Sequence, residues 1–206
     1  KIFHEIAGQS LIDYVYTIAK KISKKNIIFV CNKKNNLEIS KKFDLSKTII
    51  QKKSKGTADA VMCANRLVSK KTNVLILYGD VPFIKLTSIK RLINTFKKTK
   101  SIGCSLVFKT RKPQGYGRVE TNGKNIIKIT EEIQANNEIK KIKLCNSGIL
   151  ICKKDFLFKN IKNINNKNRK KEKFLTDLFE IAYNKKKPFK YLICSEEELQ
   201  GVNKRK

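Results

Sequence analysis

The chain has 206 residues, of which 40% are hydrophobic, so it can bury the core of one large domain and is not a disordered protein. No stretch approaches the roughly 20 uninterrupted apolar residues of a membrane span, and no secretory signal opens the chain. We therefore expect no membrane insertion. Because the first residue is not Met, we expect the true start to lie upstream.

The net charge is strongly positive, +30, from 47 Lys and Arg against 17 Asp and Glu. The cations are almost all Lys, whereas base recognition favours Arg and aromatic side chains, and Trp is absent. A nucleic-acid partner is therefore the less favoured interpretation, although the charge should steer phosphate-bearing small ligands to the protein. The six scattered cysteines form no CxxC pair, which argues against zinc and for a reduced, cytoplasmic setting.

The first half of the chain alternates between helical and extended patterns. Apolar residues recur at helical spacing in four places: 11–23, 37–43, 57–70 and 87–97. Short apolar runs predict four strands: 26–31, 48–50, 74–78 and 103–108. This alternation predicts an α/β fold in which helices flank a mixed, mostly parallel sheet.

The second half of the chain changes character. The turn residues Asn122-Gly123 predict a β-hairpin over 117–129. Later apolar patterns predict a strand, a helix, a last strand and a closing turn, in that order: 145–152, 174–183, 189–194 and 196–198. The Lys-rich segment 160–173 is interpreted as a flexible surface excursion. No linker or repeat divides the chain, so we expect a single domain over residues 1–206.

The most informative segment is the apolar run 74–82, Val-Leu-Ile-Leu-Tyr-Gly-Asp-Val-Pro. A continuous apolar run suits a parallel strand that is covered on both faces. The turn at Gly79 then places Asp80 beyond the carboxyl end of that strand, where open α/β sheets bind ligands. A carboxylate there is a hard oxygen ligand, suited to Mg2+ that is shared with nucleotide phosphates. The alternative is that Asp80 only caps the following segment.

Two glycine-containing turns fit the same chemistry. Gly56 and Thr57 begin a helix shortly after a strand and Gln51, and the backbone amides at such a helix start suit an anionic or carbonyl-rich ligand. Gly115 and Gly117 leave two backbone positions without side chains, which suits a flat sugar or base. Both turns therefore indicate close approach of a ligand to the backbone.

Polar residues later in the chain are more ambiguous. Glu131 ends one strand region and Asn146 starts another. The alternative explanation for Glu131 is a surface carboxylate at a strand end, and for Asn146 a turn residue. Asn203 supplies a lone amide oxygen near the C-terminus. The pair Thr176-Asp177 is interpreted as a helix cap, and His4, the only histidine, as structural.

In this order, these segments resemble the sugar-1-phosphate nucleotidylyltransferases, whose Rossmann-like fold carries a small β-hairpin part that binds the sugar. The resemblance is greatest to the uridylyltransferase domains of bifunctional bacterial enzymes that also acetylate glucosamine-1-phosphate. It covers nearly the whole chain and rests on eight segments: Lys1-Ile2-Phe3-His4, Gln51 with Gly56-Thr57, Leu77-Tyr78-Gly79-Asp80-Val81-Pro82, Gly115-Tyr116-Gly117-Arg118, Glu131-Glu132, Asn146-Ser147-Gly148, Leu175-Thr176-Asp177 and Gly201-Val202-Asn203.

The resemblance implies a nucleotide side of the site. Lys1 corresponds to a catalytic lysine that contacts the nucleotide phosphates. Gln51 corresponds to the amide that recognises uracil, and Gly56 with Thr57 to the turn beside the base. Asp80 corresponds to a residue that is catalytic and contacts the nucleotide through a metal ion.

The resemblance also implies a metal pair and an acceptor side. Asp80 and Asn203 correspond to the residues that hold Mg2+, which is the implied cofactor. Gly117, Glu131 and Asn146, together with Asn203, correspond to contacts with the sugar phosphate. The implied substrates are UTP and N-acetylglucosamine-1-phosphate.

The implied reaction is attack by the phosphate of N-acetylglucosamine-1-phosphate on the α-phosphorus of UTP. Pyrophosphate leaves, and UDP-N-acetylglucosamine forms for peptidoglycan and lipopolysaccharide synthesis. Because the nucleophile is already ionised, catalysis consists of alignment and charge neutralisation, with no general base. Two alternatives stay open: another nucleotidylyltransferase of the same fold, or a non-catalytic, basic nucleotide- or RNA-binding remnant. An oligomer is possible.

The sequence departs from the family pattern at several points. The family opens with a strand and a Gly-rich loop around the triphosphate, whereas this chain begins at what resembles the lysine after that loop. We therefore expect a fragment that lacks the loop and a central strand. No hexapeptide repeat follows Asn203, so we expect no acetyltransferase part in this chain. Asp59 stands where the family often has His, and Ile133-Gln134 where it has Lys-Asp.

Overall fold

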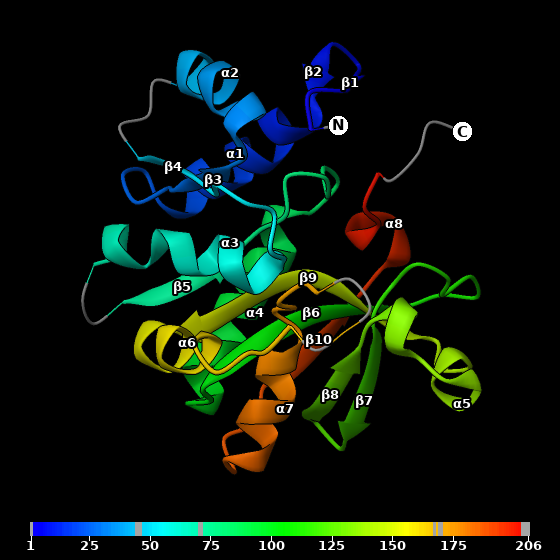
Figure 1. Ribbon diagram of the computed structural model, residues 1–206. Helices are drawn as coiled ribbons and strands as arrows, with labels where there is room; N and C mark the ends of the chain where they lie inside the picture. Colours follow the sequence, from blue (N-terminus) through cyan, green and yellow to red (C-terminus); the bar gives the residue numbers. More distant parts are fainter. Residues whose placement is uncertain (1, 44–46, 70–71, 167, 169–170, 203–206) are drawn as a thin grey trace.

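The computed structural model describes residues 2–43, 47–69, 72–166, 168 and 171–202 (Figure 1). Its larger part is a six-stranded sheet with helices on both faces, and the N-terminal residues form a smaller part above that sheet in Figure 1. The predicted α/β fold with a mixed sheet is confirmed. In the described ranges no helix is long and apolar enough to cross a membrane.

The large sheet combines two strands predicted in the first half of the chain, β5 (Asn73–Ile76) and β6 (Gly103–Lys109), with four later strands. In spatial order they are β5, β9 (Leu144–Lys153), β6, β10 (Lys190–Cys194), β8 (Asn125–Thr130) and β7 (Arg118–Asn122). Among these described strands only β6 and β10 pair in parallel, while the predicted β7–β8 hairpin and the other pairings are antiparallel. The expectation of a mostly parallel sheet was therefore wrong, because β9 returns between β5 and β6 in the opposite direction.

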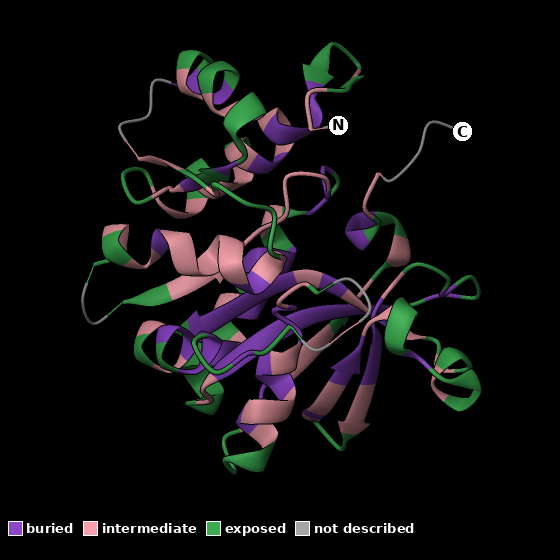
Figure 2. Cartoon of the chain, in the orientation of Figure 1, coloured by how far each residue is buried: buried purple, intermediate pink, exposed green. Residues whose placement is uncertain are grey.

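The alternation of side chains along the central strands separates two cores. On β6, Cys104 and Leu106 pack toward α4 (Leu86–Thr99), whereas Val107 belongs to the core on the opposite face. That second core is covered by three helices: α3 (Thr57–Cys63), α6 (Lys154–Ile161) and α7 (Asp177–Asn184). The central strands are consequently the most buried part of the chain (Figure 2). All six cysteines are free, and the three predicted to be small core residues are buried: Cys31, Cys104 and Cys152.

The smaller part is built around a separate two-stranded parallel sheet. Its elements are β1 (Glu5–Ile6), β2 (Gln9–Ser10), α1 (Leu11–Ile22), β3 (Phe29–Cys31), α2 (Lys33–Phe43) and β4 (Thr48–Ile50), and the sheet is formed by β3 and β4. The helices and the β3–β4 strands lie close to their predicted ranges. Stacked aromatic rings, with Phe29 and Phe43 centred 5.1 Å apart, join the sheet to α2.

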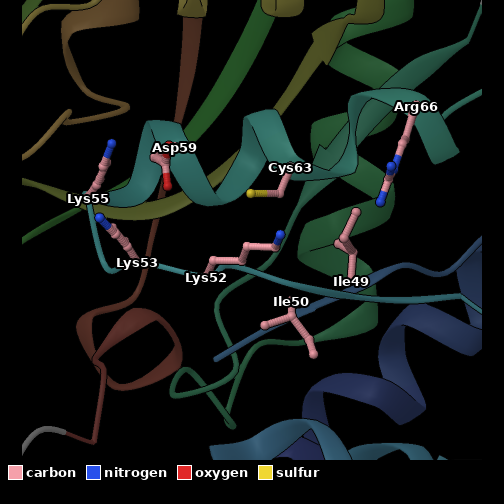
Figure 3. Close-up of a pocket in the computed structure, with 8 residues that line it drawn as sticks. All are labelled: Ile49, Ile50, Lys52, Lys53, Lys55, Asp59, Cys63 and Arg66. Atoms are coloured by element: carbon pink, nitrogen blue, oxygen red, sulfur yellow. The ribbon is translucent and has the colours of Figure 1, made fainter. Parts of the chain in front are cut away.

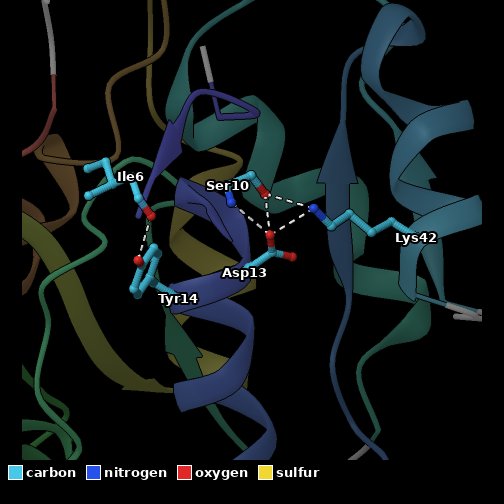
Figure 4. A network of polar contacts seen from close by, with 5 residues as sticks. All are labelled: Ile6, Ser10, Asp13, Tyr14 and Lys42. Atoms are coloured by element: carbon cyan, nitrogen blue, oxygen red, sulfur yellow. Dashed lines mark hydrogen bonds and ion pairs between the residues drawn. The ribbon is translucent and has the colours of Figure 1, made fainter. Parts of the chain in front are cut away.

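A polar network fixes the start of α1 (Figure 4). The backbone N–H and the hydroxyl of Ser10 both donate to Oδ2 of Asp13, at 2.8 and 2.6 Å. This arrangement satisfies donors that a helix start leaves without partners. Lys42 of α2 donates to the same carboxylate oxygen at 2.7 Å, so one side chain of α1 also fastens α2.

Three predicted elements differ from the structure. The strand expected over 74–78 ends at Ile76, lies at the edge of the large sheet and has half-buried apolar residues, instead of being covered on both faces. The helix expected over 57–70 changes after Cys63 into a 3-10 turn, η1 (Ala64–Leu67). The expected surface excursion is partly core, because the unpredicted α6 runs into it and Ile164 is buried. Three short elements complete the fold: η2 (Glu132–Gln134), α5 (Asn137–Lys140) and α8 (Glu196–Leu199).

Candidate active site

The predicted turn at Gly56 begins α3 and is crossed by a distant part of the chain. Gly56 has a φ of +101°, and a Cβ at this position would collide with the backbone of Lys173. The N–H of Ala58 donates to the carbonyl of Lys173 at 3.0 Å, and the N–H of Lys173 donates to the carbonyl of Lys55 at 2.7 Å. Glycine is therefore required where the two segments meet.

Gln51 is engaged by the protein itself. Its Nε2 donates to the carboxylate of Asp59 at 2.8 Å and to the carbonyl of Gly56 at 3.1 Å. The amide donors are thus used at the position where the resemblance implies base recognition. Asp59 also lines a groove of about 460 Å³ between β4 and α3, whose rim is cationic (Figure 3): Lys52, Lys53, Lys55 and Arg66.

Three of the four residues predicted to contact the acceptor lie together: Gly117, Glu131 and Asn146. A Cβ on Gly117 would be 3.6 Å from Oε2 of Glu131 and 3.6 Å from Cβ of Asn146. The N–H of Asn146 donates to the carbonyl of Gly117 at 2.9 Å, and its Oδ1 accepts the N–H of Gly148 at 3.1 Å. A bare backbone beside a carboxylate and an amide is a combination that suits sugar hydroxyls.

The prediction that Thr176 caps a helix is wrong, and its segment connects the Thr57 turn with Glu131. Thr176 precedes α7 as expected, but its side chain makes no capping hydrogen bond. Its buried hydroxyl donates instead to Oε1 of Glu131 at 2.8 Å. The N–H of the preceding Leu175 donates to the hydroxyl of Thr57 at 2.9 Å. One short segment therefore contacts both the turn predicted to bind the nucleotide and the carboxylate predicted to bind the acceptor, which the cap interpretation did not anticipate.

Tyr78 is a further residue of this region that sequence reasoning did not single out. It packs against Gly148, whose φ is +82° and where a Cβ would lie 2.7 Å from the Tyr78 ring. Burial and the negative charge of Glu131 raise the pKa of Tyr78 to about 12, while a hydrogen bond with Thr57 opposes the shift. The phenol is therefore a neutral hydroxyl at physiological pH. The only sequence signal for it was its place beside the Gly-Asp turn.

Asp80 stands between the end of β5 and the C-terminal segment. Its backbone carbonyl accepts the N–H of Val202 at 2.8 Å. Burial and Glu131 raise the pKa of Tyr78, and burial, Glu196 and Cys145 raise the pKa of Tyr116; the negative charge of Asp80 adds a smaller contribution to each. The other two predicted site residues on this side lie outside the described residues: Lys1 and Asn203.

Comparison with known proteins decides the family. A family model described as nucleotidyl transferase matches residues 1–197. The chain belongs to this family. It is 38% identical over 205 residues to the bifunctional protein GlmU of Buchnera aphidicola subsp. Schizaphis graminum, covering 98% of this chain and 44% of that protein. It is 37% identical over 214 residues to GlmU of Thermosipho melanesiensis, covering 100% and 44%. The chain therefore spans less than half the length of these curated relatives.

Solved nucleotidyl transferase structures share the fold at much lower identity. A putative glucose-1-phosphate thymidylyltransferase from Bacillus anthracis matches with a TM-score of 0.73 at 18% identity, covering 95% of this chain and 78% of that one. UDP-glucose pyrophosphorylase complexed with UDP-glucose matches with a TM-score of 0.67 at 17% identity, covering 94% and 81%. The predicted Rossmann-like nucleotidyltransferase fold is thereby confirmed.

Nucleotidyl transferases of this family generally use a divalent metal ion. The described part of the chain contains no group of three or more His, Cys, Asp or Glu side chains that could hold one. Mg2+ does not require such a cage, because it is commonly bound by one or two carboxylates together with substrate phosphates and water. Asp80 offers one carboxylate, the type of ligand that such a metal ion takes, and its backbone is held by the N–H of Val202.

Proposed function

We propose that this chain carries out the uridylyl transfer step of a GlmU-type enzyme. UTP and N-acetylglucosamine-1-phosphate are its substrates, and UDP-N-acetylglucosamine and pyrophosphate are its products. The proposal rests chiefly on the hydrogen bonds that join the Gly56–Thr57 turn, through Leu175 and Thr176, to Glu131. In this proposal the enzyme is cytoplasmic and supplies peptidoglycan and lipopolysaccharide precursors, and its free thiols support a reducing compartment.

The acceptor side has a binding and orienting role in this mechanism. The Glu131 carboxylate and the Asn146 amide bind hydroxyl and amide groups of the sugar, and Gly117 allows the sugar to approach the backbone. Thr176 holds Glu131 in position by donating to Oε1, while Oε2 is the oxygen near Gly117. The acceptor phosphate is already an anion, so the protein gains rate by aligning it with the α-phosphorus of UTP.

The nucleotide side supplies base contacts and neutralises charge. Gln51 and the Gly56–Thr57 turn contact the uracil, and Lys1 contacts the phosphates. Asp80 and Asn203 would hold Mg2+, which would supply charge neutralisation for the phosphate oxygens. Every role here concerns alignment and charge, which are the main contributions to phosphoryl-type transfer.

A second candidate is a nucleotidyl transferase of this family with a different base preference. The contact between Gln51 and Asp59 favours it, because this carboxylate stands where the resemblance implies His. The carboxylate accepts one hydrogen bond from the Gln51 amide, and the Gly56 carbonyl accepts another. The Gln51 side chain then offers an acceptor, rather than a donor, to the base. The choice of nucleotide is therefore part of the test.

The direct test is release of pyrophosphate from UTP, Mg2+ and N-acetylglucosamine-1-phosphate. CTP, dTTP, ATP and glucose-1-phosphate serve as competing substrates, and the chain is compared with the product of its complete reading frame. We expect release with UTP and N-acetylglucosamine-1-phosphate from the complete product. Release with another pair would move the assignment to the second candidate, and no release from any folded sample would overturn both.

The metal assignment is tested in the same assay by Asp80→Ala. We expect turnover to fall by about 10²- to 10³-fold, because a carboxylate that holds the metal acts on charge in the transition state. Glu38→Ala is the matched control, since it removes an exposed carboxylate of α2. Turnover close to that of the unchanged protein in a folded Asp80→Ala variant would contradict the assignment.

A further inference from the structure

Arg118 is an unusual residue for the interior of a sheet. Its side chain is 1% exposed and is the largest among the fully buried side chains. It begins β7, where it pairs with Thr130 of β8 and also with Cys145 of β9, so it is enclosed by strands on two sides. A charged side chain in such a place is normally retained only with a specific partner.

That partner is Glu132, which also holds the loop before Arg118. Nη2 of Arg118 donates to Oε2 of Glu132 at 2.7 Å, and the same oxygen accepts the N–H of Gly115 at 3.0 Å. Nη1 of Arg118 donates to the carbonyl of Tyr116. Burial raises the pKa of Glu132, but the hydrogen bonds from Arg118 and Gly115 outweigh burial and lower it. One ion pair therefore fixes two backbone groups of the loop.

The pair lies next to the acceptor contacts on both chain segments. Arg118 directly follows Gly117, and Glu132 directly follows Glu131. The two neighbours face each other across this junction, since a Cβ on Gly117 would be 3.6 Å from Oε2 of Glu131. The aromatic edge contact of Tyr116 with Phe108, with ring centroids 5.0 Å apart, anchors the same loop from the sheet side.

A gain in stability is a weak explanation for this arrangement. A buried ion pair often contributes no more than well-packed apolar residues of similar volume, because both charges lose their hydration. In addition, Nε of Arg118 has no hydrogen-bond partner within the described residues. What the forked guanidinium does provide is a defined geometry between the two segments that it joins.

We propose that Arg118 and Glu132 are a positioning pair that holds the loop 113–117 against the acceptor side and thereby sets affinity for the sugar phosphate. This inference rests on the proposed function. The part of the inference that concerns the loop, namely that the ion pair holds it in place, does not depend on enzymatic activity. Neither residue contacts the reacting atoms, since both act through their neighbours Gly117 and Glu131.

The first test measures the loop directly, in the ligand-free chain. Glu132→Gln removes the charge and retains the shape, and Arg118→Lys retains the charge and loses the fork. We expect the amide hydrogen of Gly115 to exchange at least about tenfold faster in both variants, as detected by NMR. Glu138→Gln is the matched control, because it breaks an exposed 2.7 Å ion pair with Lys141 only a few residues away. Unchanged exchange of Gly115 in a folded variant would overturn the inference.

The second test measures substrate affinity in the active product of the complete reading frame. We expect the KM for N-acetylglucosamine-1-phosphate to rise at least tenfold in Glu132→Gln and Arg118→Lys, with the KM for UTP changed less than twofold. A purely structural role would move both KM values or neither, and either outcome contradicts positioning of the acceptor. If the unchanged protein transfers no nucleotide, the proposed function fails, while the exchange measurement still decides whether the pair clamps the loop.

Discussion

Among single residues, Asp177 at the start of α7 has a protonation state that the sequence did not suggest. Its pKa is raised from 3.8 to about 6 by burial first and then by the negative charges of Glu180 and Glu131, with Lys128 opposing the shift. Between pH 3.8 and about 6, Asp177 is therefore still largely protonated in the folded chain but ionised in the unfolded chain. The free energy of unfolding consequently falls as pH rises from 3.8 to about 6, and the loss remains above that range.

Replacing this carboxyl by an amide should remove that pH dependence. Asp177→Asn cannot ionise, so we expect its melting temperature to rise relative to the unchanged protein between pH 4 and pH 7. Glu180→Gln should recover part of the gain, because it removes only one of the neighbouring charges. Thermal unfolding at a series of pH values measures the difference, and identical pH slopes for Asp177→Asn and the unchanged protein would contradict the argument.

The residue scale also shows which site residues a sequence can reveal. A backbone need for glycine at 56 and 117 could be recognised from the sequence, and the structure shows close approach of the protein's own atoms at both positions; their contact with a ligand stays a prediction. The role of Thr176 was not, since a Thr before a helix is ordinarily a cap and its actual partner, Glu131, lies 45 residues away. Side-chain partners at such a separation depend on the packing of whole elements, which local patterns do not encode.

At the scale of elements, the start of α1 links two helices through one carboxylate. Burial raises the pKa of Asp13, but the hydrogen bonds from Lys42 and Ser10 outweigh burial and lower it. We expect Asp13→Ala to reduce the free energy of unfolding by about 1 kcal/mol, the typical value of a capping interaction. Lys42→Ala should cost less, roughly 0.5 kcal/mol, because it removes only a partly exposed ion pair.

Urea unfolding at pH 7 and at pH 3 measures how far the stabilisation by Asp13 depends on the charge of its carboxylate. The stabilisation by Asp13 requires the ionised carboxylate, so it is present above pH 3.8 and is lost as pH falls through the lowered pKa. The difference between Asp13→Ala and the unchanged protein should therefore shrink in acid. A difference that is as large at pH 3 as at pH 7 would mean that the charge does not matter at this helix start.

Strand direction was the main feature of the elements that sequence patterns could not supply. The alternation of strands and helices correctly predicted the α/β class, but it favours parallel pairing only where each strand is followed by a crossover helix. In the second half, β9 enters between β5 and β6 as a long antiparallel strand. Its apolar residues suit either direction, and the register with β5 and β6 is what orients them.

For the whole molecule, the charge of +30 poses the question of nucleic-acid binding. The candidate active site is formed by the turns that follow β4, β5 and β8 and by the segment before α7. The residues of this site contact one another through hydrogen bonds of defined geometry. The lysines, in contrast, occur along the entire sequence. A uniformly basic surface attracts phosphate backbones without selecting a sequence, and that attraction depends on release of counterions.

Salt should therefore separate the two kinds of binding. We expect affinity for a random single-stranded RNA to fall by at least about 10²-fold between 50 mM and 200 mM salt, because it depends on several Lys–phosphate contacts. Binding of UTP with Mg2+ to the complete product should weaken much less, since base contacts and a metal ion add to the charge. Fluorescence anisotropy of labelled RNA and calorimetry with UTP measure the two. RNA binding that survives 200 mM salt and prefers one sequence would favour the nucleic-acid interpretation over the enzymatic one.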